Sequence, residues 1–260
     1  MSNTAKNRSI RTEGLTKRYG TSVVVDDIAL EIPAGGVVSI IGPNGAGKST
    51  MLSMIARLLP ATAGRVVIDD DDAATTRPDV FARRLGILKQ DNHLAVRLTV
   101  RDLVSFGRYP HSKGRPTPED DAAVADALAF LDLTGLAGRY LDTLSGGQRQ
   151  RAWVAMVLAQ DTDYILLDEP LNNLDIKHAR AMMALARRLA DELGKTVISV
   201  LHDVNFASAF SDSIIAMRDG RIVAHGEPSD VMTPEVLREV YETDVVVHLT
   251  DEGTRLALYW

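Results

Sequence analysis

Eight consecutive residues have the composition and spacing of a loop that wraps around phosphate groups. They run from Gly42 to Ser49 and fit the pattern G-x-x-x-x-G-K-[ST]. Glycines let successive backbone N–H groups turn inward around an anion, and a helix beginning near Lys48 would add its positive dipole end. The lysine can reach the β- and γ-phosphates of a nucleotide, and the Ser49 hydroxyl suits a magnesium ion that bridges them. The alternative is an ordinary glycine turn before a helix, but the complete motif favours a nucleotide site. Its predicted binding residues are Gly42, Pro43, Asn44, Gly45, Ala46, Gly47, Lys48, Ser49 and Thr50.

Two acidic residues follow a second apolar segment farther along the chain. Tyr164 to Leu167 has the length and composition of a buried strand, and Asp168 and Glu169 come directly after it. In a parallel sheet the carboxyl ends of strands face the ligand crevice. Asp168 would then hold magnesium through water, and Glu169 would orient or deprotonate the water that attacks the γ-phosphate. Taken alone, the pair indicates exposed acids after a strand, and the glycine loop upstream favours the catalytic interpretation.

The elements that must position these groups alternate between strand and helix. A helix is predicted from about Lys48 to Leu59, directly after the glycine loop, and another from Lys177 to Leu193. Strands that alternate with helices predict a parallel sheet with crossover helices. Asp219-Gly220 predicts a two-residue hairpin turn, because glycine tolerates the positive φ that such turns need. The predicted core strands are Val37 to Ile41, Tyr164 to Leu167, Thr196 to Leu201 and Ser213 to Met217.

Two other regions differ from this core in their pattern. Residues 10–32 contain short runs of β-branched and apolar residues, which predict antiparallel strands. Residues 92–160 are alanine-rich and amphipathic, with a loop from Pro110 to Pro118, and predict a helical subdomain. We therefore expect an α/β fold with a parallel core sheet, an N-terminal antiparallel β-subdomain and an inserted helical subdomain. The expected boundaries are a disordered leader at 1–9 and one domain at 10–260, with its core at 10–91 and 161–225, the helical subdomain at 92–160 and a tail at 226–260.

Composition narrows the classes of protein and partner. The chain has 260 residues, 45% of them hydrophobic, which is enough to bury a substantial core. Its formal net charge of -6 offers no basic field for a phosphate backbone, so we expect no nucleic-acid partner. No stretch approaches the roughly 18 apolar residues of a membrane-spanning helix, and membrane association is expected to go through another protein. The chain has no cysteine, which excludes disulfides, thiolate metal sites and a cysteine nucleophile.

A third motif carries a resemblance to a known family. Leu144 to Arg151 has the sequence L-S-G-G-Q-R-Q-R and resembles the signature motif of ATP-binding cassette (ABC) proteins. At the start of a helix this segment would form a second anion site, whereas the alternative is a serine N-cap followed by glycines. The resemblance covers nearly the whole chain after Ser9, and it implies the P-loop NTPase fold of an ABC cassette that hydrolyses ATP with Mg²⁺. It also implies a head-to-tail dimer with a second copy of the chain. The residues that would close over the γ-phosphate held by the other copy are Ser145, Gly146, Gly147 and Gln148.

Four further residues each resemble a single functional residue of the family. Tyr19 resembles the aromatic residue that stacks on adenine, with a core or turn tyrosine as the alternative. Gln90 resembles the glutamine that touches magnesium and the attacking water and connects to the helical subdomain. Asp175 resembles the aspartate that crosses the dimer interface, and its alternative is a helix N-cap. His202 resembles the switch histidine that contacts the γ-phosphate, and its alternative is a structural histidine.

Two segments are similar to those of one subgroup of cassettes. Gly107 to His111 and Pro170 to Asp175 resemble segments of cassettes that energise import of iron-siderophore complexes, haem and cobalamin. The pair Asn172-Asn173 is most similar to the ferric siderophore branch. The resemblance implies a peripheral protein on the cytoplasmic face of the membrane. Its implied partners are membrane-spanning permease subunits and, indirectly, a substrate-binding protein.

Other functions remain open at this point. Cobalamin or haem import is the alternative within the subgroup. A soluble ABC ATPase acting in DNA repair or on the ribosome is less favoured, because the chain has neither a long coiled coil nor a second cassette. A non-catalytic nucleotide-binding protein would be expected to lack Glu169 or His202, and both are present.

Overall fold

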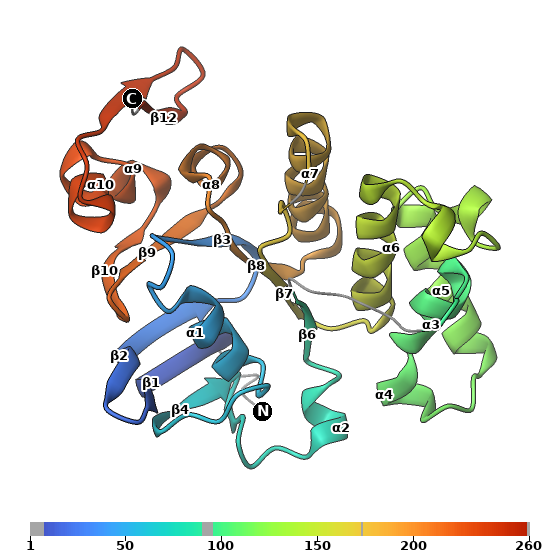
Figure 1. Cartoon of the computed structure of the whole chain (residues 1–260). Helices are drawn as coiled ribbons and strands as arrows, with labels where there is room; N and C mark the ends of the chain where they lie inside the picture. The colour runs from blue at the N-terminus through green and yellow to red at the C-terminus, as the bar shows by residue number, and fades with distance from the viewer. Residues whose placement is uncertain (1–7, 90–95, 173, 259–260) are drawn as a thin grey trace, which may run out of the picture. The chain divides into compact units, whose positions relative to one another are not determined.

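The computed structural model describes residues 8–89, 96–172 and 174–258 (Figure 1). The chain divides into two compact units, one formed by Met1–Thr76 with Met183–Trp260 and the other by Arg77–Met182. Gln90, one of the predicted catalytic residues, and Asn173 lie outside the described residues. Within those ranges, no helix combines the length and the apolar character needed to cross a membrane.

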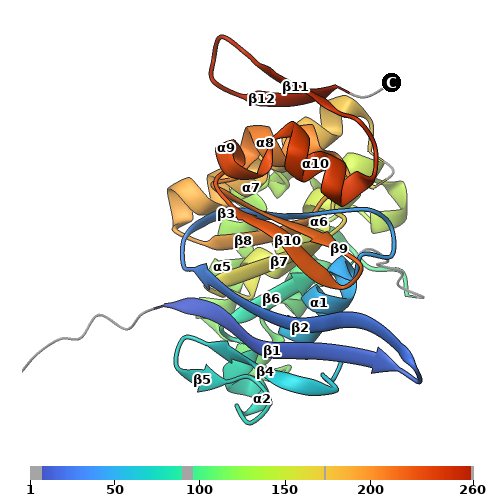
Figure 2. The ribbon, with the colours of Figure 1, turned by 90° about the vertical axis from the view of Figure 1, so that its left-hand side faces the viewer.

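The first unit contains an antiparallel sheet (Figure 2). Its strands are β1 (Ser9–Tyr19), β2 (Ser22–Pro33), β4 (Ala63–Ile68) and β5 (Asp71–Asp72), in the order β2-β1-β4-β5. Ile10 of β1 pairs with Ile32 on one side and Ile68 on the other, and all three side chains are buried. Burying such a side chain stabilises the fold by about 1.5–3 kcal/mol. The antiparallel strands predicted for residues 10–32 are therefore confirmed.

A second set of strands in this unit leads to the glycine loop and to His202. These strands are β3 (Gly36–Ile41), β8 (Thr196–Val200), β9 (Ser213–Arg218) and β10 (Arg221–Gly226). β3 pairs in parallel with both β8 and β9, so the carboxyl ends of these strands lie at the same edge. The predicted parallel sheet is confirmed. β9 and β10 form the predicted hairpin, and Asp219 and Gly220 have φ of 50° and 79°, as a type I′ turn requires.

The first unit also contains short helices and a second hairpin. They are α1 (Lys48–Ile55), α8 (Val204–Phe210), α9 (Pro228–Val231), α10 (Pro234–Tyr241) and the strands β11 (Val246–Leu249) and β12 (Arg255–Leu258). α1 is shorter than the predicted helix to Leu59, because Arg57 adopts a left-handed φ of 58° and Pro60 follows. The hairpin of β11 and β12 packs on α8, where the Asn205 side chain makes both backbone hydrogen bonds of Ala257, at 3.1 and 2.7 Å (Figure 2).

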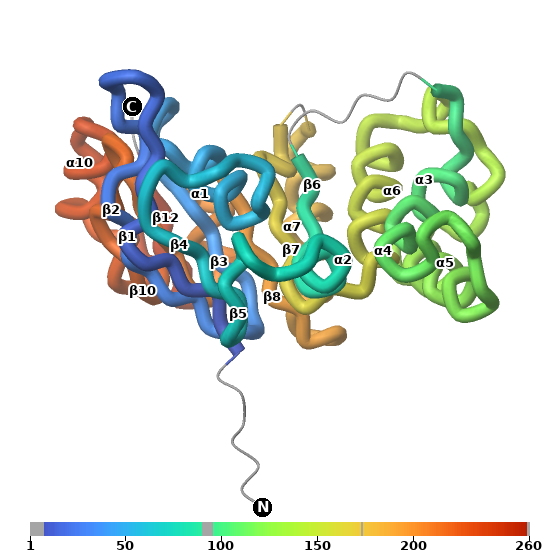
Figure 3. The backbone as a smooth tube through the Cα atoms, turned by 90° about the horizontal axis from the view of Figure 1, so that it is seen from below, coloured from blue at the N-terminus to red at the C-terminus, as the bar shows by residue number. Residues whose placement is uncertain are grey.

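The second unit combines two parallel strands with a group of helices. Its elements are α2 (Pro78–Phe81), β6 (Leu85–Leu88), α3 (Val100–Phe106), α4 (Tyr109–Ser112), α5 (Pro118–Phe130), α6 (Gly146–Ala159), β7 (Tyr164–Asp168) and the start of α7 (Ile176–Leu193). α3, α5 and α6 pack against one another (Figure 3). Thr99 and Thr117 begin α3 and α5 with capping boxes. The loop predicted from Pro110 to Pro118 is wrong at its start, because α4 includes Pro110 at its second position, where proline needs no N–H partner.

The segment from Gly107 to His111 joins the helices of this unit. A Cβ on Gly107 would overlap the Met156 carbonyl oxygen, so α3 and α6 approach too closely for another residue. His111 Nε2 donates to the Gln160 carbonyl at 2.9 Å, which ties α4 to the end of α6. These contacts give the segment a structural role inside the second unit.

Candidate functional site

The glycine loop lies between β3 and α1 of the first unit, and its backbone conformation requires glycine. Gly42, Gly45 and Gly47 have φ of 145°, 83° and 93°, all in the region that L side chains rarely adopt. A Cβ on Gly42 would also overlap the Met217 carbonyl oxygen, and one on Gly47 would meet the Val24 carbonyl oxygen. The loop can therefore keep this path only with glycine at these places.

The start of α1 is suited to an anion. The N-cap residue Gly47 has no side chain to bond the first N–H groups, and the first turn contains no acidic residue. Lys48 is buried, and its Nζ donates to the carbonyls of Gly42 at 2.8 Å and Pro43 at 2.9 Å. A positive charge, helix N–H groups and an absence of acids in this turn together fit a phosphate group. Ser49 and Thr50 follow on the same turn and are half-buried.

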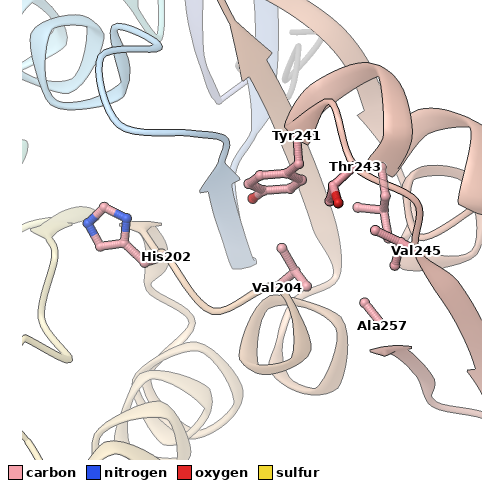
Figure 4. Close-up of a pocket in the computed structure, with 7 residues that line it drawn as sticks. His202, Val204, Tyr241, Thr243, Val245 and Ala257 are labelled. Carbon is pink, nitrogen blue, oxygen red and sulfur yellow. The ribbon is translucent and has the colours of Figure 1, made fainter. Parts of the chain in front are cut away.

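His202 follows β8 in the same unit, and the parallel pairing of β3 and β8 places it at the sheet edge where the glycine loop begins. Leu201 N–H donates to the Ile40 carbonyl at 3.0 Å, directly before both segments leave the sheet. His202 is exposed, and Asp203 caps α8. A cavity of about 290 Å³ borders His202, with Val204, Tyr241 and Val245 among its lining residues (Figure 4).

Tyr19 ends β1 and is 53% exposed, which excludes a core tyrosine; it directly precedes the turn to β2, so the turn tyrosine remains the alternative. The Lys17 ammonium lies 5.1 Å from the centre of its ring, within the range of a cation–π interaction. The exposed face of an aromatic ring at the end of a strand is available for stacking. Its role toward adenine stays a prediction.

The acidic pair ends β7 in the second unit. Asp168 is buried as the last residue of the strand, and Glu169 is half-buried with a left-handed φ of 50°. Such a conformation costs a non-glycine residue on the order of 1–3 kcal/mol and is concentrated at functional sites. Asn172 stabilises it, because its Nδ2 donates to Glu169 Oε2 at 2.5 Å and its backbone N–H donates to the Glu169 carbonyl at 3.2 Å.

Asn172 was not predicted as a site residue from the sequence. It was noted only as part of a pair that resembles one subgroup of cassettes. The signal that could have found it is an amide three residues after a carboxylate, in a turn that has Pro170 at its second position. Within the described ranges, no group of three or more His, Asp or Glu side chains gathers as a metal site. Magnesium commonly binds through one or two carboxylates together with substrate phosphates, and the Asp168 carboxylate in the second unit is a ligand of that kind.

The signature segment forms the N-terminus of α6. Ser145 is the N-cap and makes a capping box with Gln148, with N–H···O distances of 3.3 and 3.1 Å. The serine N-cap, which the sequence offered as the alternative to an anion site, is thus present. The Ser145 hydroxyl accepts the capping bond and can still donate a hydrogen bond. Ser145 and Gly146 are exposed, and the first turn carries no acidic residue. The exposed helix N-terminus is therefore electrostatically suited to an anion from outside the unit.

Asp175 precedes α7 and caps it. Its Oδ1 accepts the backbone N–H of His178 at 2.8 Å and lies 2.7 Å from Nδ1 of the same residue. These bonds lower the pKa of Asp175, the backbone bond being the larger cause. The N-cap role is therefore confirmed, and the role at a dimer interface stays a prediction. Ile176 beside it is 83% exposed.

The structure thus groups the predicted residues by unit. The first unit holds the glycine loop, Tyr19 and His202, and the second holds Asp168, Glu169, the signature segment and Asp175. Gln90 lies outside the described residues. In the second unit, Gln150 Nε2 of the signature helix donates to the Pro170 carbonyl at 3.3 Å, which ties α6 to the turn after Glu169.

Comparisons with known proteins agree with these features. The family model described as "ABC transporter" matches residues 25–172. The petrobactin import ATP-binding protein YclP of Bacillus subtilis is 46% identical over 96% of this chain and 99% of its own length. FatE of Bacillus anthracis, with the same description, is 50% identical over 92% and 95% of the two chains. The ferric enterobactin transport ATP-binding protein FepC of Escherichia coli is 44% identical over 89% and 86%.

Solved structures show the same fold. An inward-facing metal-chelate type ABC transporter has a chain with a TM-score of 0.83 and 25% identity, covering 97% of this chain and 98% of that one. The cassette MJ0796, solved as a dimer in a post-hydrolysis state with ADP and Pi, has a TM-score of 0.73 and 32% identity, covering 84% and 98%. The predicted α/β cassette fold and the resemblance carried by the signature segment are both confirmed. The chain belongs to the ABC transporter family.

Proposed function

We propose that this chain is the ATP-binding and ATP-hydrolysing subunit of an importer that takes up iron-siderophore complexes. The observation that carries the proposal is the glycine loop, whose conformation admits only glycine and whose helix start presents Lys48 and no acid. The cargo class is supported by relatives whose names specify import of petrobactin and ferric enterobactin. The chain would act at the cytoplasmic face of the membrane, bound to permease subunits and indirectly to a substrate-binding protein. Cobalamin and haem are the alternative cargoes.

ATP is the proposed nucleotide, and each predicted residue has a defined task. The loop N–H groups and Lys48 bind the phosphates, and Tyr19 stacks on adenine. Mg²⁺ would be held by Ser49, by Asp168 and by Gln90. When bound, the ion neutralises charge that develops on the β- and γ-phosphate oxygens.

Glu169 is the proposed catalytic base. Its carboxylate orients the attacking water and takes its proton, and the bond from Asn172 fixes the direction in which the carboxylate points. A positioned base of this kind contributes roughly 10²–10⁴-fold to a rate. His202 would contact the γ-phosphate and place it for attack.

A head-to-tail dimer of two copies would complete the machine. Its proposed contacts to the nucleotide of the other copy are Ser145, Gly146, Gly147, Gln148 and Asp175. The dimeric cassette MJ0796 supports this assembly, and an exposed α6 N-terminus without acids suits a γ-phosphate. Opening of the dimer after hydrolysis would move the helical subdomain linked through Gln90 and pull on a coupling helix of the permease. Free energy of ATP binding and hydrolysis would thus shift the transporter between conformations.

Glu169→Gln tests the proposal. It keeps the size of the side chain and removes the base, so we expect the ATPase rate of the purified protein to fall at least about 100-fold. Uptake of radiolabelled ferric petrobactin should be lost in cells that carry this variant. Glu252→Gln, the same change at an exposed turn, should retain both activities. Loss of ATPase with unchanged uptake would refute the siderophore cargo, and labelled haem and cobalamin would then be tested in the same cells. An unchanged ATPase rate would refute the catalytic assignment.

A further inference from the structure

The two glycines of the signature segment have different surroundings. A Cβ built on Gly146 meets nothing within 4 Å. A Cβ built on Gly147 would overlap the His178 ring, whose Cδ2, Nε2 and Cγ atoms are its three nearest neighbours. His178 comes from the first turn of α7, 31 residues later in the chain. Its ring therefore occupies the place where any other residue at position 147 would carry its side chain.

The backbone does not explain why position 147 is glycine. Gly147 is not among the residues with positive φ and is the second residue of α6. Alanine forms helix better than glycine and would fit this conformation without strain. The three described atoms nearest to the missing Cβ all belong to His178.

The His178 ring is fixed by a second contact. Its Nδ1 lies 2.7 Å from Asp175 Oδ1, and the pKa of Asp175 is lowered, so the carboxylate is ionised at neutral pH. An ionised carboxylate only accepts hydrogen bonds, so Nδ1 carries the proton and donates it. Rotating the ring away from Gly147 would break this charge-assisted bond.

A further bond joins the same two segments. Gln150 Nε2, one turn along α6, donates to the Pro170 carbonyl in the turn after Glu169. The N-terminal part of α6 is thus connected to both ends of the segment from Glu169 to His178. A shift of one of these segments is transmitted to the other through close contacts.

We propose that His178 is a positioning residue that locks Gly147 and Asp175 into one arrangement. The inference rests on the proposed function, in which Gly147 closes over the nucleotide of the second copy and Asp175 crosses the interface. The ring then connects the residues that serve the other copy's ATP with the segment that carries this copy's Glu169. Without the ring, the signature N-terminus and Asp175 would engage ATP less well.

A double-mutant cycle on steady-state ATPase activity tests the contact. Gly147→Ala forces the ring from its place, and His178→Ala removes the ring, so the two changes act on the same contact. We expect the combined variant to be about tenfold more active than the product of the single effects predicts, which is within the range of couplings for touching residues. Gly146→Ala is the matched control, and its effect should be the same whether position 178 carries histidine or alanine. Additive effects of Gly147→Ala and His178→Ala would overturn the proposal.

Rescue by side-chain type separates positioning from a general structural role. Asparagine at position 178 keeps an amide N–H near the place of Nδ1, whereas glutamine places it farther out. We expect His178→Ala to lower kcat/KM for ATP about tenfold, His178→Asn to recover part of that loss through the bond to Asp175, and His178→Gln to recover little. Binding of a fluorescent ATP analogue to the isolated chain should stay unchanged, because Lys48 is untouched. Equal kcat/KM in all three variants would overturn the proposal.

These measurements also separate the two proposals. A wild-type protein without ATPase activity refutes the proposed function itself. An active wild-type protein with additive variants refutes the role of His178 alone. If Gly147→Ala does not fold, as judged by circular dichroism and thermal unfolding, the comparison of the three His178 variants decides.

Discussion

Arg108 joins three helices of the second unit through bonds that are shielded from water. Its Nε donates to Asp120 Oδ1 at 2.8 Å, and the two side chains are only 11% and 6% exposed. Its Nη1 donates to the carbonyl of Ala159, the last residue of α6, at 2.9 Å. Asp120 is the N3 residue of the α5 capping box. Arg108→Ala would therefore release the end of α6 and the start of α5 together.

The magnitude follows from what the substitution leaves behind. Removing one partner of a buried ion pair costs about 3–5 kcal/mol, because the other charge stays buried. Asp120 keeps the Thr117 N–H at 3.0 Å and the Thr117 hydroxyl at 3.1 Å, which places the cost at the lower end. The bond to Ala159 adds to it, so we expect a loss of about 4 kcal/mol of unfolding free energy. Arg108→Lys keeps the charge but cannot make both bonds, and should cost about half as much.

Urea unfolding measures this loss. Trp153 is a buried reporter on α6, and Trp260→Phe makes it the only tryptophan of the chain. With a urea dependence of about 3 kcal/mol per M, at the upper end for domains, the midpoint should fall by a little over about 1 M for Arg108→Ala. Arg188→Ala, which removes an ion pair between half-exposed side chains on α7, is the control and should cost under about 1 kcal/mol. Equal midpoint shifts for the two variants would refute the argument from burial.

Three other predictions follow from single contacts. Asp120→Asn should make the free energy of unfolding fall less steeply as the pH is lowered. Arg108 lowers the pKa of Asp120, so the ion pair contributes its full stabilisation above about pH 5 and loses it as the pH falls through that lowered pKa. Urea midpoints from about pH 7 to about pH 3 that decline in parallel with wild type would contradict this. Asn172→Ala should lower kcat for ATP hydrolysis about tenfold and leave KM nearly unchanged, because the freed Glu169 no longer points in one direction; a change in KM alone would count against it. Gly42→Ala should abolish binding of a fluorescent ATP analogue, because its Cβ would overlap the Met217 carbonyl, and wild-type affinity would refute that interpretation of the loop.

The parts of the fold that the sequence predicted well depend on local patterns. Short apolar runs predicted β3, β7, β8 and β9 because buried parallel strands are apolar on both faces. The glycine loop was predictable because its backbone angles are ones that only glycine adopts readily, so the path of the loop is written in its residue types. The ends of helices were predicted less well, as α1 shows, because the last turn depends on the conformation of one residue such as Arg57.

Contacts between residues far apart in the chain could not be predicted from the sequence. Arg108 finds its partners 12 and 51 residues later, and no periodicity marks either one. The contact between Gly147 and His178 depends on how α6 and α7 pack, which the sequence does not specify. Asn172 is close to Glu169 in sequence, but neither their bond nor the left-handed conformation of Glu169 follows from the spacing.

The two segments that resemble the siderophore subgroup have internal roles in this chain. Gly107 to His111 holds α3, α4, α5 and α6 together through backbone carbonyls and the ion pair of Arg108. In the segment from Pro170 to Asp175, Asn172 holds Glu169 and Asp175 holds His178. The residues of both segments are therefore constrained by the fold and by ATP hydrolysis, whichever cargo the transporter carries. Substitutions in either segment should therefore impair stability or ATP hydrolysis in the isolated chain, before any cargo is present. Under the proposed function, a preference for siderophores would then be encoded in the permease and substrate-binding subunits.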